Sequence, residues 1–217
     1  MTLRGLVFIT FCFLLTNCQS PKPTSSQDPL LAFFPKAMQK DTLHVEISDS
    51  EAPRPPGDSI PNALFFSTIP SDLLQEIGYV ADSTADLILG RGHFSLDDQT
   101  EAYWVEMRQF WFQHHSLLVY DKVRKVFTDR ITLAEWYGGE GGQILIGSWL
   151  FDYDGDGKKD IVRREIEHQF LMLEDGTTED QFNESASLLL WQKGAFAEMP
   201  LKDTAATIQR YPIRSMW

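Results

Sequence analysis

Acidic residues alternate along a short, glycine-containing stretch of the chain, residues 152–160, which reads DYDGDGKKD. Its first, third, fifth and ninth positions are aspartates: Asp152, Asp154, Asp156 and Asp160. Ca²⁺ takes about six to eight oxygen ligands, and carboxylates that alternate along a curled loop can converge on one ion. Lys158 would add its backbone carbonyl, while Gly155 and Gly157 allow the positive φ angles that wrap a backbone around a cation. The stretch therefore predicts a Ca²⁺ site, and the alternative is an acidic turn that is only solvated.

The residues that follow this stretch distinguish two types of calcium loop. An EF-hand also begins with alternating aspartates, but it requires a bidentate Glu at its twelfth position, where this chain has Arg163. Residues 152–162 instead resemble the FG-GAP and VCBS repeats of integrin-α-type β-propellers, which read D-x-D-G-D-G-x-x-D and continue with two aliphatic residues, here Ile161 and Val162. The resemblance covers this loop alone, and it implies a hairpin loop and a role in scaffolding or adhesion.

The N-terminus has the pattern of a secretory signal. Residues 1–4 carry one positive charge and residues 6–15 are almost wholly apolar, which is typical of a signal peptide. A helix needs about twenty apolar residues to cross a bilayer, so this segment is too short for a permanent membrane-spanning anchor. The residues that come next are Leu15, Thr16, Asn17 and Cys18.

This Leu-x-x-Cys sequence resembles the lipobox of bacterial lipoproteins, in which the cysteine receives a diacylglyceryl group and becomes the first residue of the mature chain. Cys18 is the matching position, although Asn17 stands where Gly, Ala or Ser is usual. The resemblance implies a protein of the bacterial cell envelope that a lipid anchors to a membrane, with the membrane and its face left open. An ordinary signal peptide is the alternative.

The cysteine content bears on disulfides, and the net charge bears on which partners the protein can bind. Cys12 lies in the apolar signal and Cys18 would be lipidated, so the mature domain would contain no disulfide. The formal net charge of −12 argues against nucleic acid as a partner and against attraction to anionic lipid headgroups. Membrane attachment would therefore depend on the acyl chains, and the partners to expect beyond the membrane are an envelope protein or a glycan.

Composition divides the chain into three parts. Residues 1–17 are the predicted signal peptide. Residues 18–29 hold the lipidated cysteine and a flexible tether, because residues 19–28 are rich in proline, serine and other polar residues. Residues 30–217 are sufficient for one domain with a sizeable core.

Within this domain, runs of β-branched, aromatic and aliphatic residues separated by polar turns predict strands. We expect them at residues 42–47, 63–68, 87–89, 94–96, 102–112, 116–120, 125–133, 143–151, 161–173, 187–192 and 195–199. Residues 161–173 also fit one face of a helix, but the hairpin type of loop before them favours a strand. One short helix is expected at residues 72–77, with Ser71 as its cap and Gly78 at its end.

A degenerate repeat divides the domain into two related units. Residues 92–97 read Gly-x-Phe-x-Leu-Asp, and residues 147–152 read Gly-x-Trp-x-Phe-Asp. The pattern predicts two blade-like units, about residues 86–136 and 143–201, unless the similarity of two apolar strands is a coincidence. Because a propeller usually needs at least about four blades, the predicted fold is mainly β. It consists of compact antiparallel sheets with one short helix, and it is not a complete single-chain propeller.

Other residues with chemical potential lack the spacing that their chemistry requires. Residues 138–142 read GGEGG but do not continue into the Lys-Ser/Thr ending of a P-loop, so a flexible connector is expected. His114, His115 and His168 occur without a cysteine partner or zinc-type spacing. These histidines are expected to be hydrogen-bonded or exposed side chains.

The chain contains neither a G-x-S-x-G nor an H-E-x-x-H motif. Carboxylates that could supply a glycosidase pair are Glu140, Glu165, Glu167, Glu174 and Asp175. Tryptophans that could form a sugar-binding surface are Trp104, Trp111, Trp136, Trp149 and Trp191. The sequence therefore favours a non-catalytic binding or scaffolding module with a structural Ca²⁺ ion. A carbohydrate-binding protein and a hydrolase of glycans or peptides are the alternatives.

Overall fold

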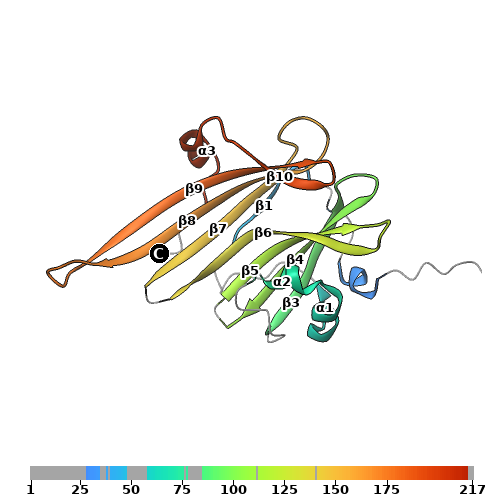
Figure 1. Ribbon diagram of the computed structural model, residues 1–217, viewed down its shortest axis with the longest axis horizontal. Helices are drawn as coiled ribbons and strands as arrows, with labels where there is room; N and C mark the ends of the chain where they lie inside the picture. The colour runs from blue at the N-terminus through green and yellow to red at the C-terminus, as the bar shows by residue number, and fades with distance from the viewer. Residues whose placement is uncertain are drawn as a thin grey trace, which may run out of the picture.

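The computed structural model describes residues 28–34, 38, 40–47, 58–75, 77, 85–110, 112–139 and 141–214. The predicted signal peptide, Cys18 and all of the tether before Asp28 lie outside these residues. In the described part of the chain the fold is mainly β, as predicted, and its strands form one open antiparallel sheet (Figure 1). The sheet does not close into a barrel or a propeller.

Strands that follow one another in the chain are neighbours in the sheet, in the order β10-β9-β8-β7-β6-β5-β4-β3-β2. The first four in sequence are β1 (Leu43–Val45), β2 (Asp58–Ser59), β3 (Leu87–Ser95) and β4 (Thr100–Gln109). The next three are β5 (Phe112–Asp121), β6 (Val126–Gly139) and β7 (Gly142–Phe151). The last three are β8 (Asp160–Met172), β9 (Thr178–Gln192) and β10 (Ala195–Met199).

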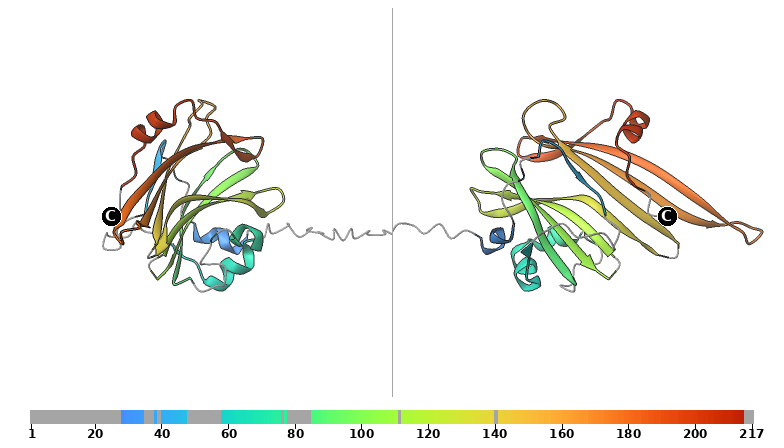
Figure 2. Two further views of the ribbon diagram at one scale, coloured as in Figure 1. Left: turned by 60° about the vertical axis from the view of Figure 1, so that its left-hand side comes forward. Right: turned by 180° about the vertical axis from the view of Figure 1, so that it is seen from behind.

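Two consecutive four-stranded meanders, β3–β6 and β7–β10, make up most of this sheet. They join where residues 135–139 of β6 pair with residues 142–146 of β7. Beyond this contact β6 separates from β7, and β1 pairs with residues 148–150 of β7 in its place. The two meanders consequently diverge and the sheet curls, as two further views show (Figure 2).

A shared hydrophobic core occupies the space between the two meanders. From the first meander it includes Phe94, Ala102, Leu117, Val119 and Leu133. From the second meander and β1 it includes Leu43, Val45, Leu145, Leu150, Ile161 and Trp191. The residues that the sequence assigned to two units therefore bury one another's apolar surface within a single sheet.

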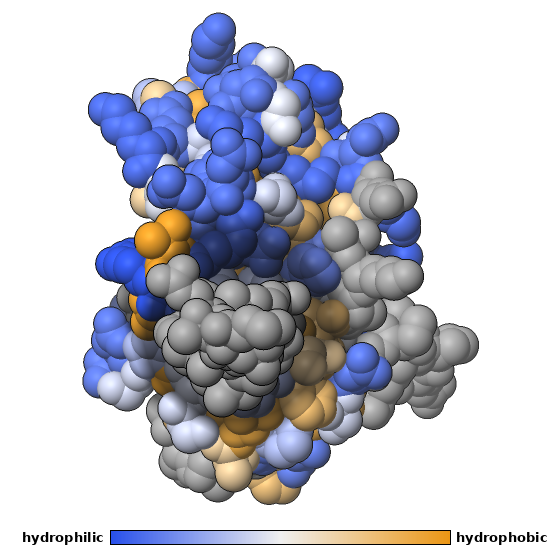
Figure 3. Space-filling model, turned by 90° about the vertical axis from the view of Figure 1, so that its right-hand side faces the viewer, coloured by the Kyte–Doolittle hydropathy of each residue, from blue (hydrophilic) through white to orange (hydrophobic). Residues whose placement is uncertain are grey.

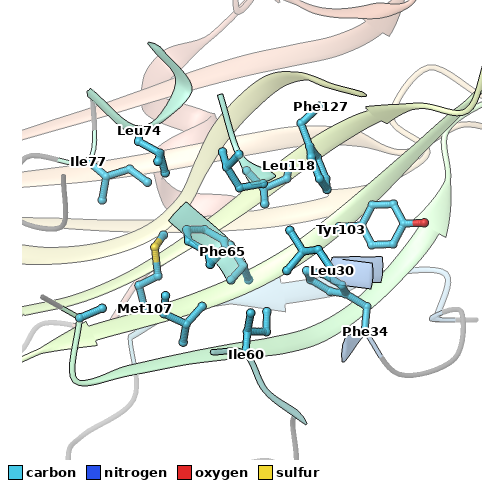
Figure 4. Close-up of a cluster of buried hydrophobic side chains, with 14 of the residues drawn as sticks. Leu30, Phe34, Ile60, Phe65, Leu74, Ile77, Tyr103, Met107, Leu118 and Phe127 are labelled. Atoms are coloured by element: carbon cyan, nitrogen blue, oxygen red, sulfur yellow. The ribbon is translucent and has the colours of Figure 1, made fainter. Parts of the chain in front are cut away.

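Helices cover the other face of the first meander. They are the 3₁₀ helix η1 (Pro29–Phe33) and the α-helices α1 (Asn62–Thr68) and α2 (Ser71–Gln75). Figure 4 shows Leu30 of η1, Phe65 of α1 and Leu74 of α2 gathered with side chains from β4 and β5, including Met107 and Leu118. At Gly90 of β3 a Cβ atom would collide with the carbonyl of Phe33, so glycine allows η1 to lie directly on the sheet.

The predicted strand at residues 63–68 is wrong, because this segment is helix α1. A six-residue apolar run is too short for its periodicity to separate a strand from a buried helix. Packing of Phe65, which is fully buried, decides the outcome. The helix expected at residues 72–77 corresponds to α2, but α2 begins at Ser71, the predicted cap, and ends at Gln75, while Gly78 lies outside the described residues. With η1, α1 and α3 (Thr204–Arg210), the described chain contains more than the one short helix predicted.

After residue 86 the predicted segments are strands, including β8, where a helix was the alternative. Two boundaries were wrong: residues 87–89 and 94–96 belong to the single strand β3, and the predicted strand 102–112 contains the turn between β4 and β5. β9 begins at Thr178, well before the predicted residue 187. The prediction missed its first half because the residues there are polar and exposed, without the apolar run used to predict strands. α3 (Thr204–Arg210) was not predicted, although Asp203 caps it by accepting a hydrogen bond from the Ala206 N–H at 2.9 Å. α3 is held to the sheet by the buried Arg164, which donates to the carbonyls of Ile208 and Tyr211 at 2.7 and 2.8 Å.

Candidate functional site

The acidic loop connects β7 to β8 at the end of the sheet on the right in Figure 1. Phe151 and Asp160, which flank it, are paired residues of the two strands, so the loop closes a β-hairpin as the repeat resemblance implied. Gly155 and Gly157 both have φ of +85°, which confirms the positive φ angles expected of them. The glycines therefore give the loop the curl that a single-ion site requires.

Three of the predicted ligands lie close together on this curl. Carboxylate oxygens of Asp152, Asp154 and Asp156 all lie within 4.8 Å of one another, and the three side chains are exposed. Backbone N–H groups hold the first carboxylate: Gly155 N donates to Asp152 Oδ1 at 2.8 Å and Gly157 N to Asp152 Oδ2 at 3.0 Å. The loop thus brings three hard oxygen donors close together, and oxygen is the ligand type that Ca²⁺ prefers.

Asp160 lies beneath the loop and outside this group of three. It is 2 % exposed, and its two oxygens accept hydrogen bonds from the backbone N–H groups of Trp191 at 2.8 Å and Tyr153 at 3.0 Å. Burial raises the pKa of its carboxyl group above the ordinary value. Asp160 therefore fixes the base of the loop to β9.

The two lysines of the loop have separate contacts. Lys158 Nζ lies 3.1 Å from Asp156 Oδ2, and hydrogen bonds from the Lys158 backbone and ammonium group lower the pKa of Asp156. Lys159 Nζ donates to the carbonyls of Lys40 and Asp41 at 2.7 and 2.9 Å. Lys159 therefore fixes the loop to the segment that precedes β1, whereas Lys158 shields part of the acidic charge.

A polar hollow of about 550 Å³ lies at this same end of the molecule, between the β3–β4, β5–β6 and β9–β10 turns. Asp97, which lines the hollow, accepts a hydrogen bond at 3.1 Å from Trp191 Nε1, while the backbone N–H of Trp191 donates to Asp160. Figure 3 looks at the molecule from this end and shows hydrophilic side chains gathered over its upper part. Trp191 thus connects the base of the acidic loop to the hollow beside it.

A second polar group, which the sequence did not reveal, lies between the first meander and the helices. His114 Nδ1 is 2.6 Å from Glu135 Oε2, and His114 Nε2 is 2.6 Å from Ser116 Oγ. Arg130 Nη1 donates to Ser116 Oγ at 3.2 Å, and Arg130 Nε donates to the Leu73 carbonyl of α2 at 2.8 Å. The order of Ser, His and Glu matches the connectivity of a nucleophilic triad.

The Ser116, His114 and Glu135 network is closed to a substrate by burial, and its contacts connect the sheet to α2. Ser116 and His114 are both 0 % exposed, so a substrate carbonyl cannot reach Ser116 Oγ while the helices remain in place. Arg130 instead links the network to the carbonyl end of a turn in α2. The signal in the sequence was the placement of polar His114 and Ser116 at alternate positions of an otherwise apolar strand, which puts both side chains on one face.

A third polar group surrounds Glu106 on β4, which is 1 % exposed. Its carboxylate forms ion pairs with Arg91 and with Arg108, whose Nε lies 2.5 Å from Glu106 Oε1. Burial is the largest influence on the Glu106 pKa and raises it, but His115 and the two guanidinium groups outweigh burial and lower the pKa. His115 itself accepts a hydrogen bond at Nδ1 from Trp104 Nε1 at 3.0 Å.

The remaining candidates are dispersed. His114, His115 and His168 are buried and contact polar neighbours, as expected of hydrogen-bonded histidines. Residues 138, 139, 141 and 142 belong to the tight β6–β7 hairpin. Trp104, Trp136 and Trp149 are half-buried and Trp191 is buried, while Trp111 and Glu140 lie outside the described residues. Glu165 and Glu167 are half-buried on β8, and Glu174 and Asp175 are exposed at the β8–β9 turn.

These features define the chain as an open, mainly antiparallel β protein with a hairpin loop that gathers three aspartates. Comparison with protein-family models, with curated proteins and with solved structures finds no match. In the described ranges, no helix has both the length and the apolar composition needed to cross a membrane.

Acid should destabilise the fold through the buried histidines. Burial lowers the pKa of His115 from 6.5 to about 3, so the unfolded chain binds a proton over this range that the folded chain excludes. The free energy of unfolding should therefore fall from pH 6.5 toward pH 3, with a slope of about 1.4 kcal/mol per pH unit from this one residue. Burial also lowers the pKa of His114, which adds a change of the same sign.

Urea unfolding of His115→Gln at several pH values checks this prediction, because the variant should lose the slope that His115 contributes. His44→Gln, which removes a histidine whose side chain is 41 % exposed, is the matched control for the loss of one histidine side chain. Parallel pH profiles for His115→Gln and the parent would contradict the assignment.

Proposed function

We propose that this protein is a lipid-anchored lipoprotein of the bacterial cell envelope, in which a Ca²⁺-stabilised β domain binds or holds another envelope component without catalysis. The observation that carries the metal assignment is the convergence of the Asp152, Asp154 and Asp156 oxygens on one exposed loop. The D-x-D-G-D-G-x-x-D resemblance of residues 152–160 supports the same assignment.

The chemistry of the donor set fits Ca²⁺. Three carboxylates and the backbone carbonyl of Lys158 would provide hard oxygen ligands, and the curl at Gly155 and Gly157 brings the carboxylates together. Asp160 would complete the set if one of its oxygens also reached the ion. Because Asp160 accepts the N–H of Trp191, an ion there would stiffen the contact between loop and core.

Ca²⁺ should raise the thermal stability of the domain. A ligand that binds only the folded state adds about 2.7 kcal/mol at a hundredfold excess over its Kd, and extracellular modules often bind Ca²⁺ with a Kd of ~10⁻⁴–10⁻³ M. The melting temperature should therefore be higher in excess Ca²⁺ than in EDTA. Because Trp191 contacts both Asp160 and Asp97, tryptophan fluorescence should report the same titration.

Asp156→Ala should abolish most of this gain, because it removes one of the three converging carboxylates. Asp175→Ala removes an equally exposed turn carboxylate outside the loop and is the matched control. If the melting temperature did not change with Ca²⁺, or if Asp156→Ala responded like the parent, the metal assignment would be wrong.

The anchor assignment is supported by the apolar signal that precedes Cys18 and by the polar composition of residues 19–28. Cys18→Ala should release the protein from the membrane fraction, because the thiol that carries the lipid is absent. Cys12→Ala, which changes the other cysteine within the signal, should leave the protein membrane-bound. A processed Cys18→Ala protein that still required detergent for extraction would disprove lipid anchoring.

The non-catalytic part of the proposal is supported by two polar groups that lie away from solvent. The Ser116 hydroxyl is buried, and the Glu106 carboxylate is neutralised by arginines inside the sheet.

The binding part of the proposal can be tested in intact cells. Crosslinking through lysines, followed by purification and mass spectrometry, should capture one reproducible protein partner. Capture of glycan fragments alone would favour a sugar-binding surface. Hydrolysis of a polysaccharide or peptide by the purified protein, abolished by one Glu→Gln change outside the loop, would refute the non-catalytic role.

A further inference from the structure

The ends of β8 and β9 form an arm, residues 170–184, that projects from the sheet on the left of Figure 1 and on the right of the second view in Figure 2. The last pair between β7 and β8 is Gly142 with Gln169. Beyond it, within the described residues, β8 is bonded to β9 alone, apart from one hydrogen bond at 3.3 Å from the Phe170 N–H to the Gly141 carbonyl. The arm is therefore a two-stranded ribbon without a core of its own.

Large apolar side chains are exposed along this ribbon. Their exposed fractions are Phe170 46 %, Leu171 40 %, Met172 80 %, Leu173 41 % and Phe182 48 %. The Phe182 ring stacks on the buried His168 with ring centroids 4.6 Å apart, which fixes its position at the base of the arm. Because side chains alternate across a ribbon, Phe170, Met172 and Phe182 lie on one face of the arm and Leu171 and Leu173 on the other. Exposed apolar side chains grouped on a face mark an interaction surface.

Acidic side chains predominate along the arm and at its base. The range from residue 165 to residue 192 contains no Lys or Arg, and its carboxylates are Glu165, Glu167, Glu174, Asp175, Glu179, Asp180 and Glu184. Asp180 lies 2.7 Å from His168, and Glu184 pairs with Arg164 at 2.5 Å. The apolar side chains thus lie within a field that favours a positively charged partner.

One strand of the arm also has an open edge. β10 pairs with β9 only at residues 188–192, and Arg164 Nε donates to the carbonyl of Ser185 at 2.9 Å. Among the described strands, none pairs with the outer edge of β9 over residues 178–184. Such an edge can accept an extended segment through backbone hydrogen bonds.

We propose that an extended, basic segment of a partner protein, with apolar residues between its Lys or Arg residues, adds as a strand to β9 at residues 178–184. This inference rests on the proposed binding role and names the chemistry of the partner. Charge selects this occupant among the candidates. A second copy of the chain would bring two acidic arms together, and an anionic lipid surface would be repelled in the same way.

The test measures binding of a labelled ten-residue peptide of alternating Lys and Val to the full mature protein by fluorescence anisotropy. The Lys-Val peptide should bind, and the matching Glu-Val peptide should bind at least about tenfold more weakly because its charges are repelled. A Lys-Val peptide with N-methylated backbone amides keeps its charge but cannot pair with a strand edge. It should also lose about tenfold in affinity.

Variants locate the site. Glu179→Lys with Gln181→Lys changes the charge of the open edge and should weaken the Lys-Val peptide about tenfold. Glu198→Lys with Gln192→Lys makes the same two chemical changes at exposed positions off the arm and should leave the affinity unchanged. No binding of the Lys-Val peptide, equal binding of its N-methylated form, or equal weakening by both double variants would overturn the proposal.

Failure of this inference can be separated from failure of the proposed function. If lysine crosslinking in cells captured the same partner from the parent and from the Glu179→Lys, Gln181→Lys variant, the binding role would stand and the arm would be excluded as its surface. Loss of that partner from this variant alone, with a Lys- or Arg-rich peptide crosslinked in the parent, would support the arm. If no partner were captured from the parent or from the variant, both the binding role and the arm as its surface would be rejected.

Discussion

An open sheet must cover both of its faces, and this requirement organises the molecule. β5 shows the constraint most clearly, because nine of its ten residues are buried. Its even-numbered side chains, such as Leu118, pack against the helices, whereas its odd-numbered ones, such as Leu117, contact the second meander through the shared core. A sheet buried on both faces needs a layer on each side, and here the curl of the sheet supplies one of them.

Divergence of the two meanders is therefore a requirement of the core. β6 pairs with β7 only at residues 135–139, and β1 completes the edge of β7 beyond that point. At the loop end, Trp191 is 2 % exposed within the shared core and binds both Asp160 and Asp97. The acidic loop consequently stands on a buried base, through which the proposed ion would influence the stability of the core.

The sequence predicted features that depend on local chemistry. Runs of β-branched, aromatic and aliphatic residues between polar turns predicted the strands after residue 86, and β10 matches its predicted range of 195–199. The positive φ angles of Gly155 and Gly157 followed from the need for a curl. Features set by distant contacts could not be predicted: Phe65 is drawn into a helix by packing on β4 and β5, and Asp160 is turned inward by a backbone group of Trp191, 31 residues away.

The buried polar groups also combine a feature that the local sequence predicts with partners that only the fold determines. His114 and Glu135 are 21 residues apart in the chain, and only the register of β5 against β6 makes them cross-strand neighbours. A strand pattern predicts that His114 faces the helices or the core, but it does not specify the partner. The register shift between His115 and Ser116 in the β5–β6 ladder is equally invisible in the sequence.

The tether and the arm lie on opposite sides of the molecule, which relates the proposed anchor to the proposed binding surface. η1, which begins one residue after Asp28, lies on the right of the molecule in Figure 1, and the arm lies on the left. With Cys18 as the lipid anchor and residues 19–28 as the tether, attachment would begin at the side opposite the arm. Anionic headgroups would then repel the acidic surface, and because the tether joins the domain on the side away from the arm, the open edge of β9 would stay accessible to an extended segment of another protein.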